Sequence, residues 1–286
     1  QTEDRTFDRK NKNFNASIGL EYYINQKSSI TGNFVYRKSK GEDIATNITD
    51  RFLLNDPTQI LLNESRVENE DEDGIDKQYS INYTNNLNDN GEKITIDLQY
   101  GDSEQTENSP IKVNDVLSED NSQLTNSKER LLQIDYVLPI GDAQFEAGYR
   151  GNFQESTNDY QLDQLNLDSG VFETNLGLTN IFTYTQNINA LYTQYGDKLG
   201  KFSYLLGLRL ENTQLKGEVD ASVDLTELQE ILGGEIDLDF DKNYLGLFPT
   251  INLIYELNEM ENFSIGYNRR INRPRGFFIN PFPSRS

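Results

Sequence analysis

The 286-residue sequence contains no cysteine and no histidine. Without cysteine there is no disulfide framework and no thiolate metal site. Without histidine, Ser-His and Cys-His nucleophilic catalysis is excluded, and the commonest side-chain ligand of transition metals is missing. We therefore expect no cofactor, and we expect that the protein is not an enzyme.

Long apolar runs and positive charge are also scarce. No stretch approaches the roughly 20 residues that a transmembrane helix needs, and the N-terminal residues QTEDRTFDRKNKN lack the apolar region of a signal peptide. The 26 basic and 47 acidic residues give a net charge of −21, which argues against nucleic acid as a partner. Only 35% of the residues are hydrophobic, but 16 tyrosines and 15 phenylalanines indicate a folded chain, because disordered segments contain few aromatics.

What the sequence does contain is alternation with a period of two. In residues 14–24, FNASIGLEYYI, apolar side chains occupy every second position from Phe14 to Ile24, as in a strand with one apolar face. Similar runs occupy residues 30–38, 77–84, 93–100, 130–138, 143–151, 187–195, 201–213, 250–258 and 262–271. Short polar turns join these runs in pairs, and one of the turns contains the hairpin signal Asn90-Gly91. The sequence thus predicts ten strands in five hairpins.

The links between hairpins are long and polar. They cover residues 39–76, 103–127, 154–180 and 214–243, and exceed the usual loop length of compact domains. Alternating short and long links are typical of outer-membrane barrels, which have tight periplasmic turns and long external loops. We therefore predict an all-β fold, an antiparallel up-and-down transmembrane β-barrel, here partial, with about ten strands and long external loops.

A soluble β-sandwich would show the same alternation of side chains. Four residues distinguish the two folds: Leu206, Leu208, Ile94 and Ile96 face lipid in a barrel, but lie between two sheets in a sandwich. The opposite strand faces are polar, and Arg37, Arg150, Arg209 and Glu211 are our candidates for lining the lumen. An ordinary solvated sheet face would have the same composition. Because tryptophan is absent, any interfacial girdle must consist of tyrosine and phenylalanine.

Three motifs suggest chemistry but have simpler interpretations. VENEDEDGID, residues 67–76, has calcium-loop spacing, but Ser80 occupies the twelfth position, where such a loop needs a glutamate. We interpret it as a solvated acidic loop, with divalent-cation bridging to lipopolysaccharide as the alternative, and we also expect DLDFDKN at 237–243 to be solvated. LTELQEILGG at 225–234 predicts a short helix that stiffens an external loop. The 47 acidic residues include many possible pairs for glycoside hydrolysis, but no cleft is identifiable from the sequence.

The last 40 residues carry the most specific motif. In SIGYNRRINRPRGFFINPFP, residues 264–283, a strand ends in an Arg-Arg pair and is followed by Ile-Asn-Arg-Pro and Asn-Pro-Phe. The sequence here resembles the outer-membrane β-barrel family of Bacteroidota-type TonB-dependent receptors. The matching positions are Arg269, Arg270, Ile271, Asn272, Arg273, Pro274, Asn280, Pro281 and Phe282. The hairpin at 191–213 is similar to another stretch of that family, with Gly207, Arg209 and Glu211 at its centre.

This resemblance implies a receptor in the outer membrane of a Gram-negative cell. Such receptors hold a plug domain inside a barrel of about 22 strands. They import a scarce nutrient, such as a metal chelate, saccharide or peptide, with energy from the TonB system. Residues 1–286 would be part of one outer-membrane β-barrel domain, with the plug and remaining strands not present, and would form an open, curved sheet. The alternatives are a secreted or surface β-rich binding or adhesion module, and a carbohydrate-active enzyme.

If the short turns are periplasmic, the strand at 262–271 runs outward and Arg269–Arg275 emerge at the outer rim. Guanidinium groups there suit lipopolysaccharide phosphates, through paired hydrogen bonds, or the carboxylates of neighbouring loops. Both interpretations stay open at this stage. The expected partners are outer-membrane lipid and lipopolysaccharide, the protein's own plug domain, the TonB system and an unknown small ligand.

Overall fold

The computed structural model describes residues 1–53, 56–221 and 239–273, which form a single antiparallel sheet of 11 strands. Ten of them follow one another along the sheet in chain order, and the short β7 pairs with β6. The strands are β1 (Thr2–Asn25), β2 (Ser28–Leu53), β3 (Asp56–Asn86), β4 (Lys93–Val113), β5 (Val116–Ile140), β6 (Ala143–Leu165), β7 (Phe172–Thr174), β8 (Asn180–Leu199), β9 (Phe202–Ala221), β10 (Phe240–Glu256) and β11 (Asn262–Asn268).

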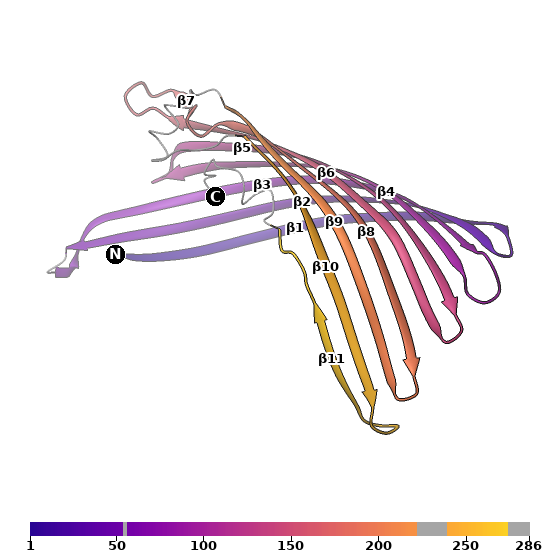
Figure 1. The fold of residues 1–286 in the computed structure, drawn as a ribbon. Coiled ribbons are helices and arrows are strands. Elements are labelled where there is room, and N and C mark those ends of the chain that lie inside the picture. The colour runs from indigo at the N-terminus through magenta and orange to yellow at the C-terminus, as the bar shows by residue number, and fades with distance from the viewer. Residues whose placement is uncertain (54–55, 222–238, 274–286) are drawn as a thin grey trace.

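The sheet is one twisted, curved layer with β1 and β11 at its two edges (Figure 1). The predicted up-and-down order of ten strands is confirmed, as is the expectation of an open, curved sheet. The described part of the chain contains no helix that is long and apolar enough to cross a membrane.

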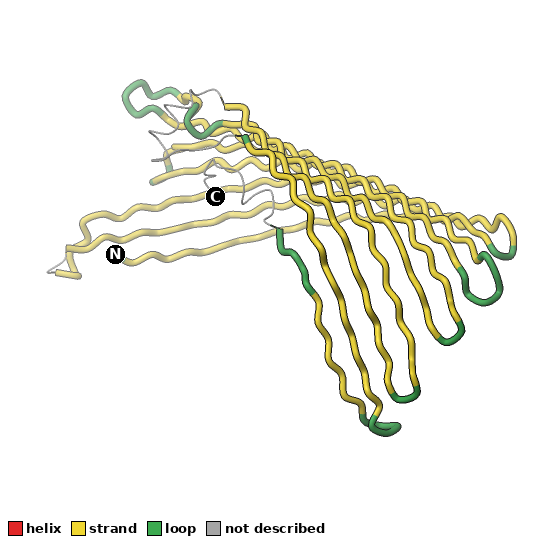
Figure 2. The backbone as a smooth tube through the Cα atoms, viewed as in Figure 1, coloured by secondary structure: helices red, strands yellow, loops and turns green. Residues whose placement is uncertain are grey.

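Short turns join the strands along one end of the sheet (Figure 2). Two of them place glycine in the left-handed region, Gly141 at φ 64° and Gly200 at φ 61°. Glycine reaches this region without steric cost, which suits the tight hairpins that connect β5 to β6 and β8 to β9. In each of the five predicted hairpins, the two strands pair with each other in the structure.

The predicted long loops, in contrast, are mostly strand. Of the residues expected in loops, 39–53 belong to β2 and 103–113 to β4. The connection from β4 to β5 is a two-residue turn, Asn114-Asp115, with φ of 50° and 65°. The prediction that links alternate strictly between short and long is therefore wrong. The segment 67–76, interpreted from sequence as a loop, lies within β3.

Polar contacts explain why these strands continue without an apolar face. In the extended parts of these strands, Asn63 donates to Asp50 at 2.7 Å and Gln105 donates to Glu72 at 3.0 Å. Backbone ladder bonds need no particular side chain, so polar cross-strand pairs sustain the sheet as well as apolar ones do. Periodicity of apolar residues therefore detected only the part of each strand that has an apolar face. The predicted helix at 225–234 lies outside the described residues.

The two faces of the sheet differ in exposure. Leu206 and Leu208 are 46% and 45% exposed, and Ile94 and Ile96 are partly exposed, so no two-sheet core encloses them. The buried hydrophobic residues other than Ala143 lie on the opposite, polar face: Ile111, Tyr160, Leu162, Phe182, Tyr184, Ala190 and Leu215. Side chains crowd together on the concave side of a curved sheet, so we infer that the polar face is concave. The exposed apolar face is the one expected for a barrel wall in lipid.

Candidate functional site: an ion-pair network on the polar face

The four candidate lumen residues share one face of the sheet. Register pairs Arg209 with Tyr192, Tyr192 with Gly148 and Gly148 with Asp135, so side chains from β9, β8, β6 and β5 point the same way. Arg150 lies two residues after Gly148 on this face, and Glu211 two residues after Arg209. Arg37 belongs to the same face on β2, but its partner is Asp76 and it is not joined to the others. The structure thus brings three of the four residues together.

Glu211 is the centre of this network. Its side chain is only 6% exposed, and its Oε2 atom accepts hydrogen bonds from Nε and Nη2 of Arg209 at 2.9 and 2.7 Å. The Oε1 atom accepts a hydrogen bond from Thr213 at 3.3 Å and forms an ion pair with Arg273. A buried carboxylate is stable only when it is paired and hydrogen-bonded, and Glu211 meets both conditions within the chain.

Arg273 reaches this site from beyond the last strand. Its Nη2 atom donates to Thr213 Oγ1 at 3.0 Å, and its Nε atom donates to the Tyr244 hydroxyl of β10 at 3.2 Å. The sequence predicted a strand that extends to residue 271, but β11 ends at Asn268. Arg273 therefore lies five residues beyond the end of the strand. The chain therefore turns back over the polar face of β10 towards β9.

The remaining motif residues have different surroundings. The backbone N–H of Arg269 donates to the Pro249 carbonyl at 3.1 Å, and its guanidinium lies 5.9 Å from the centre of the Phe248 ring. Arg270 and Asn272 are exposed. Pro274, Asn280, Pro281 and Phe282 lie outside the described residues. We expected Arg269–Arg275 at the outer rim, and this placement stays a prediction. Arg273 pairs with Glu211, which lies nine residues along β9 from Phe202 at its start.

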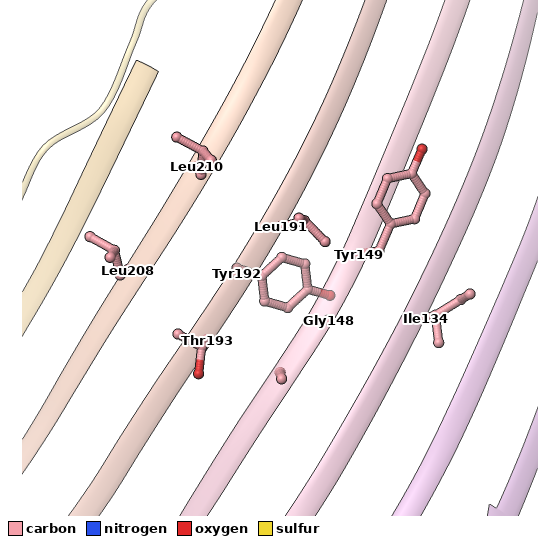
Figure 3. Close-up of a pocket in the computed structure, with 9 residues that line it drawn as sticks. Ile134, Gly148, Tyr149, Leu191, Tyr192, Thr193, Leu208 and Leu210 are labelled. Atoms are coloured by element: carbon pink, nitrogen blue, oxygen red, sulfur yellow. The ribbon is translucent and has the colours of Figure 1, made fainter. Parts of the chain in front are cut away.

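A second branch of the network passes through Tyr192. The Arg209 guanidinium lies 5.9 Å from the centre of the Tyr192 ring, and the Tyr192 hydroxyl donates to Asp135. Figure 3 shows this ring reaching from β8 towards Gly148 of β6, where a Cβ atom would come within 2.5 Å of it. Gly148 therefore makes room for the ring, and the ring carries the network from β9 to β5.

Arg150 completes the site by donating to Gln133 Oε1 at 3.1 Å. A pocket of about 340 Å³ lies among these groups, lined by Gln133, Asp135, Arg150, Tyr192, Thr193, Gln194, Gly207, Leu208, Arg209, Phe248 and Thr250. Its chemistry is that of a polar, charged surface able to hold water or an ionic side chain. Among the described residues, no group of three or more acidic side chains is arranged to hold a metal ion.

Sequence reasoning placed Asp135 on the polar face but did not find Tyr192, Thr213 or Tyr244. The run at 187–195 is apolar at positions of both parities, so the alternation does not assign Tyr192 to either face. The signal that identifies Tyr192 is its register opposite Arg209, which becomes available only with the strand pairing.

Comparison with known proteins supports the assignment of the fold. The model of the outer membrane protein beta-barrel family matches residues 85–286, more than half of the chain. Comparison with curated proteins gives no match.

Three solved structures align with most of this chain. The copper transporter OprC aligns with a TM-score of 0.50 and 8% identity, over 89% of this chain and 42% of that one. The open form of the ferric-catecholate import receptor Fiu from E. coli K12 aligns with a TM-score of 0.48 and 9% identity, over 93% and 54% of the two chains. Unliganded ferric citrate transporter FecA gives 0.44 and 9%, over 86% and 42%. The chain thus spans about half the length of these structures. It belongs to the outer membrane protein beta-barrel family, and its location is the outer membrane.

Proposed function

We propose that this chain forms part of the wall of a TonB-dependent receptor of Bacteroidota type, which imports a scarce nutrient across the outer membrane without catalysing a reaction. One observation carries the proposal. A single curved sheet exposes an apolar face, while its opposite face holds an ion-pair network centred on the buried Glu211. A membrane barrel with a wet or plugged lumen needs this combination, because one face meets lipid and the other meets water or protein.

In this proposal Arg37, Arg150, Arg209 and Glu211 line the lumen and contact water or the plug domain. Residues 1–286 are part of one barrel domain, and further strands outside them pair with β1 and β11. Unpaired backbone groups at these two edges would each cost several kcal/mol in hydrocarbon, which is why barrels close. The plug and the contact with the TonB system also lie outside these residues.

The nutrient is a metal chelate, a saccharide or a peptide. The similar structures named above are described as transporters or receptors for copper, ferric catecholate and ferric citrate. At 8–9% identity they indicate the fold alone, so a metal chelate is simply the first class to test.

The test is uptake by cells that do or do not carry the full-length protein. Radiolabelled ferric and copper chelates, oligosaccharides and peptides are offered in turn, with and without a protonophore that removes the energy of the inner membrane. We expect one class to accumulate only in cells that have both the protein and an energised membrane.

Two results would overturn the proposal. Binding of a ligand at the cell surface without uptake would indicate a surface binding or adhesion module. Chemical conversion of an offered compound that depends on the protein would indicate an enzyme.

A further inference from the structure

One row of cross-strand neighbours on the apolar face contains four aromatic side chains and one arginine. Register aligns Phe34 with Tyr79, Tyr79 with Tyr100, Tyr100 with Arg130, and Arg130 with Phe153. The Phe34 and Tyr79 ring centres are 4.9 Å apart, and those of Tyr79 and Tyr100 are 6.2 Å apart. Because the strands of a barrel are tilted, such a row climbs along the membrane normal. Arg130 and Phe153 each lie ten residues from the short turn between β5 and β6, whereas Tyr79 and Tyr100 lie seven residues from the turn between β3 and β4, so Arg130 and Phe153 are the highest members of the row.

The height of Arg130 agrees with the outer interface. Arg130 lies ten residues before Ile140, where β5 ends at the short turn. At about 3.4 Å per residue and a tilt of about 40°, this corresponds to roughly 26 Å along the membrane normal. The apolar band of an outer-membrane barrel is about 25 Å tall. If the short turns are periplasmic, Arg130 lies at the level of the outer-leaflet headgroups.

An apolar groove begins directly beneath Arg130. It has a volume of about 400 Å³ and is lined by Tyr79, Ser80, Ile81, Leu98, Gln99, Tyr100, Arg130, Leu131, Leu132 and Phe153. In the row below Arg130, Leu132 is followed on β6 by Gly151, which has no side chain. The Phe153 ring leans over Gly151 and limits the groove on that side. The groove thus runs from an arginine into the hydrocarbon region.

Arg130 has no counter-ion in the part of the chain that the structure describes, where no hydrogen bond or ion pair joins it to another residue. The row above it on the same face alternates in sign, with Lys77, Asp102, Lys128 and Glu155 in register. The acidic members of that row, Asp102 and Glu155, both lie opposite Lys128 in register, so neither lies directly opposite Arg130. A cation in this place is stable only with an anion or with water.

We propose that Arg130 binds the phosphate of an outer-leaflet lipid whose acyl chain lies in the groove between β3 and β6. The guanidinium offers paired N–H donors that match phosphate oxygens, and the groove offers apolar surface continuous with the surrounding lipid. Phosphate complements the positive charge of Arg130, which is why this occupant is favoured over a neutral lipid or a protein partner. The inference concerns the lipid face and does not depend on the imported nutrient.

The test uses the full-length protein, purified in detergent, with lipid A and dephosphorylated lipid A as probes. Native mass spectrometry counts the lipid molecules bound to wild-type protein, Arg130→Gln and Lys112→Gln. Lys112 is a matched control, because it is an exposed cation of the same face on β4 but lies beyond the membrane band. We expect Arg130→Gln to lower lipid A binding at least five-fold and Lys112→Gln to leave it unchanged.

The comparison of the two lipids needs no variant and so does not depend on the variant's folding. Wild-type protein should bind lipid A at least five-fold more tightly than the dephosphorylated form. Equal binding of both lipids would show that the groove holds acyl chains without a phosphate contact, and would overturn the proposal. So would equal binding of lipid A by folded Arg130→Gln and wild-type protein, which would mean that Arg130 extends into water.

Discussion

Arg273 and Glu211 form an ion pair across β10, although Arg273 follows the last strand and Glu211 lies on β9. The guanidinium extends over β10, where Tyr244 accepts one of its hydrogen bonds. The Arg-rich motif at the end of the sequence therefore has a structural role within the wall of the sheet. Its Arg273 attaches the segment after β11 to the polar face.

We expect Arg273→Gln to lower the free energy of unfolding by about 2–3 kcal/mol, less than full loss of a buried ion pair because Arg209 still holds Glu211 and because Arg273 is 17% exposed. Urea unfolding of the full-length protein in lipid vesicles measures this change. The control is Arg37→Gln, which breaks a pair whose side chains are 52% and 42% exposed and should cost under about 1 kcal/mol. Similar costs for both variants would show that the Arg273 pair is an ordinary surface contact.

Leu208→Arg places a charge on the apolar face of β9, near the middle of the membrane band. It should destabilise the protein by about 2–4 kcal/mol, because an arginine at this depth is transferred from water to hydrocarbon. Ser203→Arg on the polar face of the same strand should cost much less. The same unfolding assay measures both variants. Equal sensitivity of the two faces would contradict the membrane orientation of the sheet.

Gly148→Ala tests the route of the network through Tyr192. The new Cβ atom would come within 2.5 Å of the Tyr192 ring, so the ring must move away from Asp135. We expect a loss of about 1–3 kcal/mol in the free energy of unfolding, as for other overpacked sites. Gly32→Ala is the control, since nothing lies within 4 Å of its added Cβ atom. If the two alanine variants are equally stable, Tyr192 is not fixed by Gly148.

From Glu107 we expect the stability of the sheet beyond the membrane band to depend on pH. Burial, and then the negative charges of Glu70, Glu72 and Glu68, raise the pKa of the Glu107 carboxyl from 4.5 to about 6. The folded state therefore binds a proton more tightly than the unfolded state, so the stability of this region falls as pH rises from about 4.5 to about 6.

Hydrogen exchange of β3 and β4 at pH 5 and pH 7, corrected for the intrinsic rate at each pH, measures this effect. Protection should be greater at pH 5, and Glu107→Gln should make protection nearly independent of pH. If Glu107→Gln keeps the full pH dependence of the wild type, another group is responsible.

The sequence was sufficient for the order of the strands and, where apolar residues alternate strictly, for the assignment of side chains to faces. Alternation over residues 201–213 placed Leu206 and Leu208 on one face and Arg209 and Glu211 on the other, as the strand register shows. The assignment of faces succeeds because the side-chain period of a strand is two, so a face in contact with lipid has an apolar residue at every second position of the sequence.

The sequence did not determine how far the strands extend. Residues 39–53 and 103–113 have no apolar alternation, yet they continue β2 and β4 through backbone ladders and polar pairs. Hydrogen bonds between backbones depend on a neighbouring strand and not on the identity of the side chains. A prediction from composition alone therefore assigns such polar segments to loops.

Face polarity was thus set by local sequence, whereas the ion-pair network was set by the tertiary structure alone. Arg273, Glu211, Tyr192 and Asp135 come from four separate segments of the chain, and only the register of β5 to β10 brings them within contact distance. The Glu211 carboxylate is buried because the curvature of the sheet excludes water from it. That curvature cannot be predicted from the residues around Glu211 in the sequence.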